Sequence, residues 1–145
     1  MPVPNLEGTY QLVCRDLPDS TVQRPPQLKG MLTITKEYRN FSVVWKDEKG
    51  KYYSECYVAR YKLTEKEYSE TQEYLIINDQ IQDKGASYDL SAGTASSPVT
   101  IQGNQVRFAL PQPFEKALSI EVVFEGPKMT ASSEGLFVDH WEKVS

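Results

Sequence analysis

Alternation between apolar and polar residues, in short runs separated by turn residues, is the feature that most constrains this fold. In residues 52–63, one set of alternate positions is rich in tyrosine and the other set becomes basic toward its end. A period of two residues is typical of β-strands, which favour aromatic and β-branched side chains. No stretch carries a helix-length apolar stripe of period 3.6, and the best candidate, residues 113–118, suffices for a single turn. We therefore expect an all-β fold with strands at residues 9–14, 30–35, 39–46, 52–63, 67–78, 99–102, 105–110, 119–125, 129–133 and 136–144.

The lengths of the connections favour a barrel over a sandwich. Long connections alternate along the chain with tight turns at residues 36–38, 64–66, 103–104 and 126–128. An up-and-down meander places successive connections at alternate ends of the sheet, whereas a Greek-key sandwich mixes long and short ones. We expect a single antiparallel up-and-down β-barrel over residues 1–145, closed by pairing of its first and last strands. Its open mouth would be lined by the long connections at residues 15–29, 47–51, 79–98 and 111–118, of which the Gly/Ser/Ala-rich 79–98 is expected to be a lid or a mobile rim.

Composition excludes several classes of function. A chain of 145 residues has the size of one domain, and no apolar run approaches the ~20 residues that cross a bilayer. Sixteen basic residues against twenty acidic ones, with no dense basic block, argue against a nucleic-acid partner. A P-loop and a Gly-x-Gly-x-x-Gly turn are both missing, so no cofactor is expected. The start lacks the pattern of a secretory leader, which predicts a cytoplasmic protein.

The cysteines and the single histidine also limit the chemistry. Cys14 and Cys56 form no Cys-x-x-Cys pair and are expected to be half-buried thiols in a reducing compartment. A zinc site would require His140, both cysteines and a carboxylate to converge, so no metal is expected. His140 is opposite in parity to Trp141, which predicts that His140 lies on the surface if Trp141 points inward.

Several short motifs resemble the lipocalin-like proteins of the calycin superfamily. Gly8-Thr9-Tyr10 is similar to the Gly-x-Trp of their first strand, with tyrosine in place of tryptophan. Residues 29–35 and 40–43 look like the second and third strands, and Trp141-Glu142-Lys143 resembles the Trp-x-Arg/Lys ending of small bacterial members. Tyr68-Ser69-Glu70 is similar to a Tyr-x-Glu pattern in their middle strand. The resemblance implies a lipocalin-like barrel of about eight to ten strands; Tyr10 also fits other calycins, such as the ten-stranded fatty-acid-binding type.

Alternate residues of a barrel strand point inward, which predicts what the lumen contains. The first strand offers Tyr10, Leu12 and Cys14 on one face. In residues 67–78 the two faces are hard to distinguish, and a bulge would exchange them halfway along the strand. The expected ligand-binding walls are Leu12, Phe41, Val43, Trp45 and Ile76, with Tyr57, Tyr61, Glu70, Gln72 and Tyr74 orienting the ligand.

Three functions compete for such a lumen. Apolar walls with a few polar groups predict binding of a small apolar or amphipathic molecule. The first alternative is a cofactor-free isomerase or cyclase, in which Glu70, or Glu55, acts with a tyrosine donor. The second alternative is a barrel filled by its own side chains, with a structural or assembly role. If Glu55 and Glu70 both lie inside, one pairs with Arg60 or a ligand cation, or stays protonated; a homodimer is left open.

Overall fold

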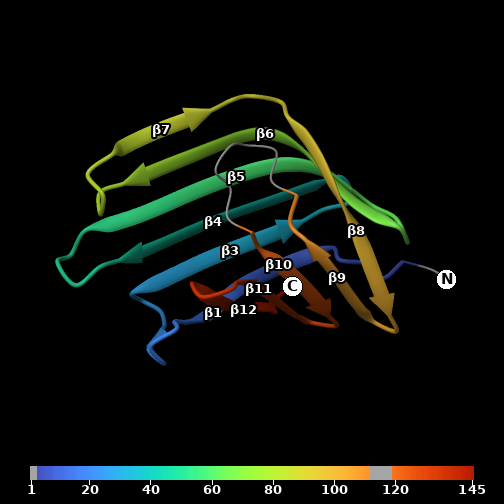
Figure 1. The fold of residues 1–145 in the computed structure, drawn as a ribbon, viewed down its shortest axis with the longest axis horizontal. Coiled ribbons are helices and arrows are strands. Elements are labelled where there is room, and N and C mark those ends of the chain that lie inside the picture. Colours follow the sequence, from blue (N-terminus) through green and yellow to red (C-terminus); the bar gives the residue numbers. More distant parts are fainter. Residues whose placement is uncertain (1–2, 112–118) are drawn as a thin grey trace.

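The computed structural model describes residues 3–111 and 119–145, which form one all-β domain (Figure 1). The strands are β1 (Gly8–Asp16), β2 (Val22–Gln23), β3 (Leu28–Ile34), β4 (Tyr38–Lys46), β5 (Tyr52–Leu63), β6 (Glu67–Asp79), β7 (Gly85–Asp89), β8 (Thr94–Gln102), β9 (Gln105–Ala109), β10 (Glu121–Glu125), β11 (Lys128–Ser133) and β12 (Phe137–Lys143). Within these residues there is no helix of the length and apolarity that spanning a membrane requires. The single turn considered at residues 113–118 lies outside the described residues.

All strand pairings are antiparallel, and the sheet closes on itself. Its order is β12-β11-β10-β9-β8-β6-β5-β4-β3-β1, and β12 also pairs with β1. These ten strands form the barrel, while β2 pairs with β1 and β7 pairs with β6 outside the closed path. The predicted single up-and-down barrel, closed by its first and last strands, is therefore confirmed.

The connections are distributed between the two ends largely as expected. The tight turns after β3, β5, β8 and β10 lie at one end, and the connections after β1 and β4 lie at the other. Nearly all of the connection expected at residues 111–118 lies outside the described residues. The short turn between β11 and β12 also lies at this second end, so the mouth is not rimmed by long connections alone. In Figure 1, β4 to β7 extend to the left beyond the shorter β9 to β11, which makes the mouth lopsided.

The expectation that residues 79–98 form a loop is wrong. This segment contains β7 and the first half of β8, and both pair with β6: β7 with its end, β8 with its start. Together, β7 and the start of β8 occupy the side of β6 that does not pair with β5. Most of their positions are exposed, so their sequence of small and polar residues carries no apolar alternation that would reveal them.

Two β-bulges decide which residues face the lumen. The register of β6 against β5 shifts at Glu73, as the sequence left open, so the inward face passes from Gln72 to Leu75. The register of β1 against β12 shifts between Leu12 and Cys14. A bulge adds one residue to one strand and re-aims the side chains beyond it. Arg15 is consequently buried opposite Asp139, and Cys14 faces away from the lumen, against the expectation that it shares a face with Leu12.

Aromatic rings fill the narrow end of the barrel. Tyr68 stacks on Phe108 with ring centroids 4.0 Å apart, and Phe124 contacts both Phe108 and Tyr10. The hydroxyl of Tyr10 donates to the carbonyl of Leu6 at 2.9 Å, which satisfies the buried phenol. Tyr10 thus closes the floor of the barrel as expected, and free space remains toward the mouth.

Gly30 allows the ring of Trp141 to approach the backbone of β3. A Cβ atom at position 30 would lie 2.9 Å from Val43 Cγ1 and 3.0 Å from Trp141 Cη2. Because interiors are packed as densely as organic crystals, neither group has room to withdraw freely.

Gly30→Ala should therefore destabilise the fold by about 1–3 kcal/mol, the usual cost of overpacking. Urea unfolding measures this free energy directly. Lys29→Ala, at an exposed position of the same strand, is the control and should change it by less than about 0.5 kcal/mol. Equal stability of Gly30→Ala and the wild type would contradict the close contact with Trp141.

Candidate functional site

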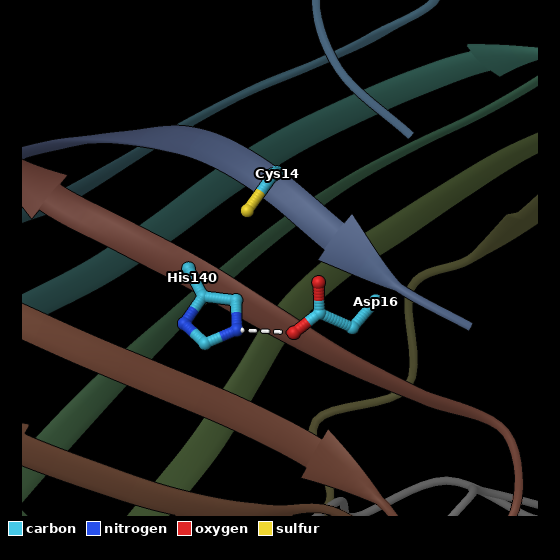
Figure 2. Close-up of side chains that lie close together, drawn as sticks. All are labelled: Cys14, Asp16 and His140. Carbon is cyan, nitrogen blue, oxygen red and sulfur yellow. Dashed lines mark hydrogen bonds and ion pairs between the residues drawn. The ribbon is translucent and has the colours of Figure 1, made fainter. Parts of the chain in front are cut away.

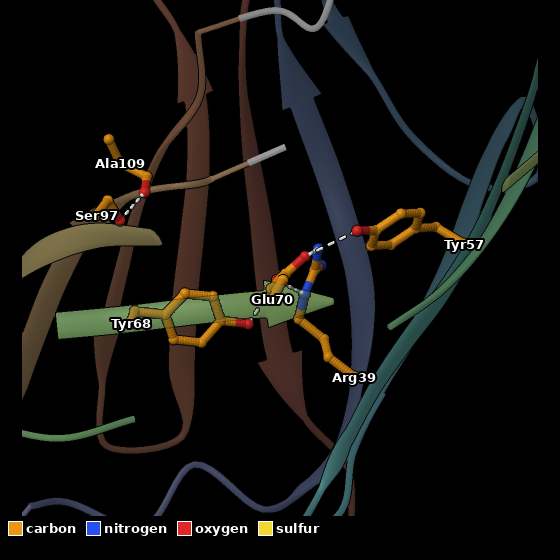
Figure 3. A network of polar contacts seen from close by, with 6 residues as sticks. All are labelled: Arg39, Tyr57, Tyr68, Glu70, Ser97 and Ala109. Carbon is orange, nitrogen blue, oxygen red and sulfur yellow. Dashed lines mark hydrogen bonds and ion pairs between the residues drawn. The ribbon is translucent and has the colours of Figure 1, made fainter. Parts of the chain in front are cut away.

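A buried ion pair joins three strands inside the barrel (Figure 3). Arg39 of β4 donates through Nε and Nη2 to the two carboxylate oxygens of Glu70, at 2.6 and 3.1 Å. The hydroxyls of Tyr57 from β5 and Tyr68 from β6 donate to the same carboxylate at 3.0 and 2.5 Å. Glu70 is 1% exposed. Four donors use the acceptor capacity of one carboxylate, so the arrangement gives Glu70 a structural position at the centre of a network.

The tyrosines of this network stay neutral donors. Burial, and then the negative charge of Glu70, raise the pKa of both Tyr57 and Tyr68 above the usual value for a phenol. Neither hydroxyl can therefore release its proton near neutral pH.

A second ion pair lies nearer the mouth. Arg15 donates to both carboxylate oxygens of Asp139, at 2.7 and 2.9 Å. The guanidinium carbon lies 4.5 Å from the centroid of Trp45 and 4.6 Å from that of Phe137. A planar guanidinium both pairs bidentately and stacks on aromatic rings, which holds this arginine rigidly in place.

A cavity of about 80 Å³ lies in the lumen between these two ion pairs. Side chains of β1, β3 to β5 and β10 to β12 line it, and both Arg15 and Arg39 reach its wall. The apolar lining is Leu32, Phe41, Val43, Leu110, Ile120, Val122, Met129, Ala131, Phe137 and Trp141. The indole Nε1 of Trp141 is buried and meets no acceptor among the described residues. A buried donor without an acceptor is costly for the fold.

Two carboxyl groups, those of Asp139 and Glu55, lie in the described cavity wall, and Asp139 is paired with Arg15. Glu55 is half-buried and forms no salt bridge with another described residue. Burial raises its pKa, while the charge of Arg15 and a hydrogen bond from Tyr53 act in the opposite direction. With Arg15 and Arg39 positive, and Asp139, Glu70 and an ionised Glu55 negative, the cavity wall with its two ion pairs carries one excess negative charge.

Some of the expected site residues line the cavity, others are buried elsewhere in the barrel, and the rest make other contacts. Phe41 and Val43 line the cavity. Leu12, Tyr57 and Gln72 are buried inside the barrel but are not part of the cavity wall. The amide of Gln72 donates to the carbonyls of residues 89 and 91 and so fastens the link between β7 and β8.

The remaining predicted residues serve other contacts. Trp45 stacks on Tyr53 with ring centroids 4.3 Å apart, beneath Arg15. Tyr61 donates to the carbonyl of residue 35 at the narrow end, at 2.6 Å. Tyr74 and Ile76 follow the bulge at Glu73 and pair with outward positions of β5, so their expected place in the lumen is wrong.

The site residues predicted from the sequence include neither Arg15 nor Arg39, and they also lack Asp139. Arg39 shares its parity with Phe41, and Asp139 shares that of Trp141, so alternation alone could have placed them inside. Arg15 could not be found in this way, because the bulge after Leu12 reverses the parity.

The larger depressions lie outside the lumen. A groove of about 930 Å³ at the narrow end is lined by charged residues that include Lys36, Arg60 and Lys62 and by apolar residues such as Leu6 and Leu63. A second groove of about 480 Å³ borders the turn between β11 and β12 and includes Asp16, Glu121 and Glu134. Both are open to solvent and mix apolar with charged side chains, whereas the lumen cavity is more enclosed and combines apolar walls with few polar groups, as small-molecule sites do.

Both cysteines are free thiols, as predicted; Cys14 is half-buried and Cys56 is exposed rather than half-buried. No protein family, curated protein or solved structure matches this chain. The function must therefore be inferred from the side chains of the barrel itself.

Glu70→Ala should reduce the free energy of unfolding by about 3–5 kcal/mol, because it leaves the Arg39 charge buried and uncompensated. The double variant Arg39→Met/Glu70→Leu should be less destabilised than this single variant, since no charge is left unpaired. Urea unfolding gives both values. Glu73→Ala is the control: its partner Arg60 is 60% exposed, and breaking that pair should cost less than about 1 kcal/mol. A double variant less stable than Glu70→Ala would contradict the role of the unpaired charge.

Glu55 should make stability depend on pH in a defined direction. Its pKa is raised in the folded state, so its contribution is fully present below the unfolded value of about 4.3 and is lost as pH rises through the folded pKa. Glu55→Gln resembles the neutral form. Thermal melts should show this variant to be more stable than the wild type at neutral pH, with the difference disappearing below about pH 4. Glu48→Gln, in the exposed turn after β4, should show no such trend; a constant difference across pH would contradict the assignment.

Proposed function

We propose that the protein binds one small, mostly apolar molecule in the lumen of the barrel, with Glu55 as the polar anchor. The cavity carries this proposal, because it joins apolar walls from several strands to a carboxyl without a charged partner among the described residues. We also propose that the ten-stranded closed meander is a lipocalin-like barrel of the calycin superfamily, with which its closure and strand order are compatible.

The size of the cavity limits the part of the ligand that it holds. A volume of about 80 Å³ equals the share of two or three water molecules in the liquid, at roughly 30 Å³ each. It accommodates a short apolar group or the head of a longer molecule whose remainder points to the mouth. A larger ligand would require side chains of the wall to move.

The charges of the wall define the head group. Arg15 and Arg39 are neutralised by their bidentate carboxylates, and Glu55 contributes the excess negative charge. A cationic or hydrogen-bond-donating group complements Glu55. The ligand class is therefore a small amphipathic molecule with an amine or hydroxyl head.

Catalysis by the same lumen is the second candidate. A half-buried carboxyl with a raised pKa, next to a tyrosine hydroxyl, is suited to proton transfer near neutral pH. Glu55 takes this role in place of Glu70, whose oxygens already accept four hydrogen bonds. In a cofactor-free isomerase or cyclase, Glu55→Gln would abolish turnover and leave binding largely intact.

Short alkyl amines and the alcohols of the same chain length are suitable probes. Binding is measured by calorimetry and by the fluorescence of Trp141, which lines the cavity. Glu55→Gln should weaken an amine by about 1–3 kcal/mol, the range for a hydrogen bond to a charged group, and should barely change the affinity for the alcohol. Equal losses for amine and alcohol would contradict the role of Glu55.

A variant that fills the cavity tests whether the probes bind there. Ala131 lies on the cavity wall, and Ala131→Leu adds three carbon atoms to it, so every probe should be excluded while the fold is kept. Thr130→Leu, which places the same side chain at the neighbouring position of β11, outside the cavity wall, is the control and should bind as the wild type does. If no probe binds to the wild type, the barrel is filled by its own side chains and the proposal is wrong.

A further inference from the structure

Three potential metal ligands of different chemistry meet on the outer wall of the barrel. Figure 2 shows Cys14 and Asp16 on β1 and His140 on the neighbouring β12, with their side chains directed toward one another. The Cys14 Sγ, a carboxylate oxygen of Asp16 and a ring nitrogen of His140 all lie within 4.8 Å of one another. We propose that this cluster binds one divalent transition-metal ion, with Zn²⁺ as the ion that best fits it.

The set of donors selects the class of metal. Thiolate, imidazole and carboxylate are the three ligand types of zinc in proteins, and zinc sites that keep an open position have three protein ligands. Hard cations such as Mg²⁺ and Ca²⁺ prefer oxygen donors alone, so one carboxylate with a thiol and an imidazole does not suit them. Water would occupy the fourth position, which is accessible because the side chains of His140 and Asp16 are 40% and 48% exposed.

The geometry requires a small adjustment of the side chains. Metal-to-ligand bonds of 2.0–2.3 Å place tetrahedral ligand atoms roughly 3.3–3.8 Å apart. The longest separation in the cluster is at most 4.8 Å, and His140 Nε2 lies 2.8 Å from Asp16 Oδ2 in a hydrogen bond. Metal binding replaces this hydrogen bond and draws the Cys14 thiol in by at most about 1 Å. Cys14 is directly opposite His140 in the register, so the backbone already holds the ligands as neighbours.

The bulge of β1 explains why these residues meet. With regular alternation, Cys14 would share the face of Leu12 and point into the lumen. The extra residue at Val13 turns Cys14 and Asp16 to the outer wall, where His140 lies. Bulges are frequent next to functional sites, where they re-aim side chains.

The charges favour a divalent ion. Thiolate and carboxylate together contribute two negative charges, which a divalent cation neutralises while the imidazole binds as a neutral ligand. Binding requires deprotonation of the thiol, whose proton passes to solvent. Burial and the charge of Asp16 raise the pKa of the Cys14 thiol, against the smaller effect of Arg24, which is close enough to act on the thiol electrostatically and lowers that pKa.

The position of the cluster gives binding a structural consequence. Cys14 and Asp16 belong to the first strand of the barrel and His140 to the last, so the ion would cross-link the two strands that close the sheet. Because the ligands lie together in the folded chain, binding stabilises the fold by mass action. The site is independent of the lumen, and its test does not depend on any ligand bound there.

Cobalt(II) is the spectroscopic probe for the site. The full chain, treated with a chelator and kept reduced, is titrated with Co²⁺ and then with Zn²⁺. We expect one Co²⁺ per chain, a thiolate-to-cobalt charge-transfer band, displacement by Zn²⁺ and a metal-dependent rise in melting temperature. Cys14→Ser should remove the band, and His140→Gln or Asp16→Asn should weaken binding by more than roughly tenfold, the lower limit for loss of even an outer-shell partner.

Cys56→Ser is the matched control, because Cys56 is an exposed thiol on β5, away from the cluster. This variant should bind Co²⁺ as the wild type does. Alkylation of the wild type adds a readout that needs no variant: Zn²⁺ should protect Cys14 and leave Cys56 reactive. Absence of the charge-transfer band in the wild type, its persistence in Cys14→Ser, or equal alkylation of both cysteines with Zn²⁺ present would each overturn the proposal.

Discussion

The pairing of β1 with β12 is the constraint on which the rest of the structure depends. Without it, the ten-stranded sheet would expose two open edges, and no lumen would exist. The register shift between Leu12 and Cys14 then determines what each side of this seam contains. Arg15 turns inward to pair with Asp139, and Cys14 turns outward to meet His140. One additional residue in one strand therefore shapes both the interior cavity and the cluster on the outer wall.

The interior is organised by charges as much as by apolar packing. Arg15 and Arg39 each hold a carboxylate through two hydrogen bonds in a largely desolvated environment. Buried ion pairs can often be replaced by apolar residues without loss of stability, so stability alone does not account for them. In a binding lumen they have a second use, because they supply fixed polar walls while cancelling each other's charge. The charge that remains is that of Glu55, and it defines the polarity of the proposed ligand.

The sequence predicted a strand well where its apolar and polar residues alternate regularly, and poorly where a bulge or two exposed faces interrupt that alternation. The range of β5 was predicted in full, since residues 52–63 alternate without interruption, and the closed meander followed from the spacing of such runs. β7 was missed because both of its faces are exposed. Glu70 was correctly expected inside, but pairing with Arg39 depends on the distance between two strands, which alternation does not encode. Arg15 and the convergence of Cys14 with His140 were hidden by the β1 bulge, for which the sequence carries no signal.

The central claim is that the lumen is a binding site and not merely a packing defect. Native mass spectrometry of the freshly purified protein tests this claim most directly, with Ala131→Leu prepared in parallel. We expect the wild type to carry one small molecule per chain and the cavity-filled variant to have the mass of the bare chain. Detection of each protein only at the mass of its own bare chain would contradict the claim.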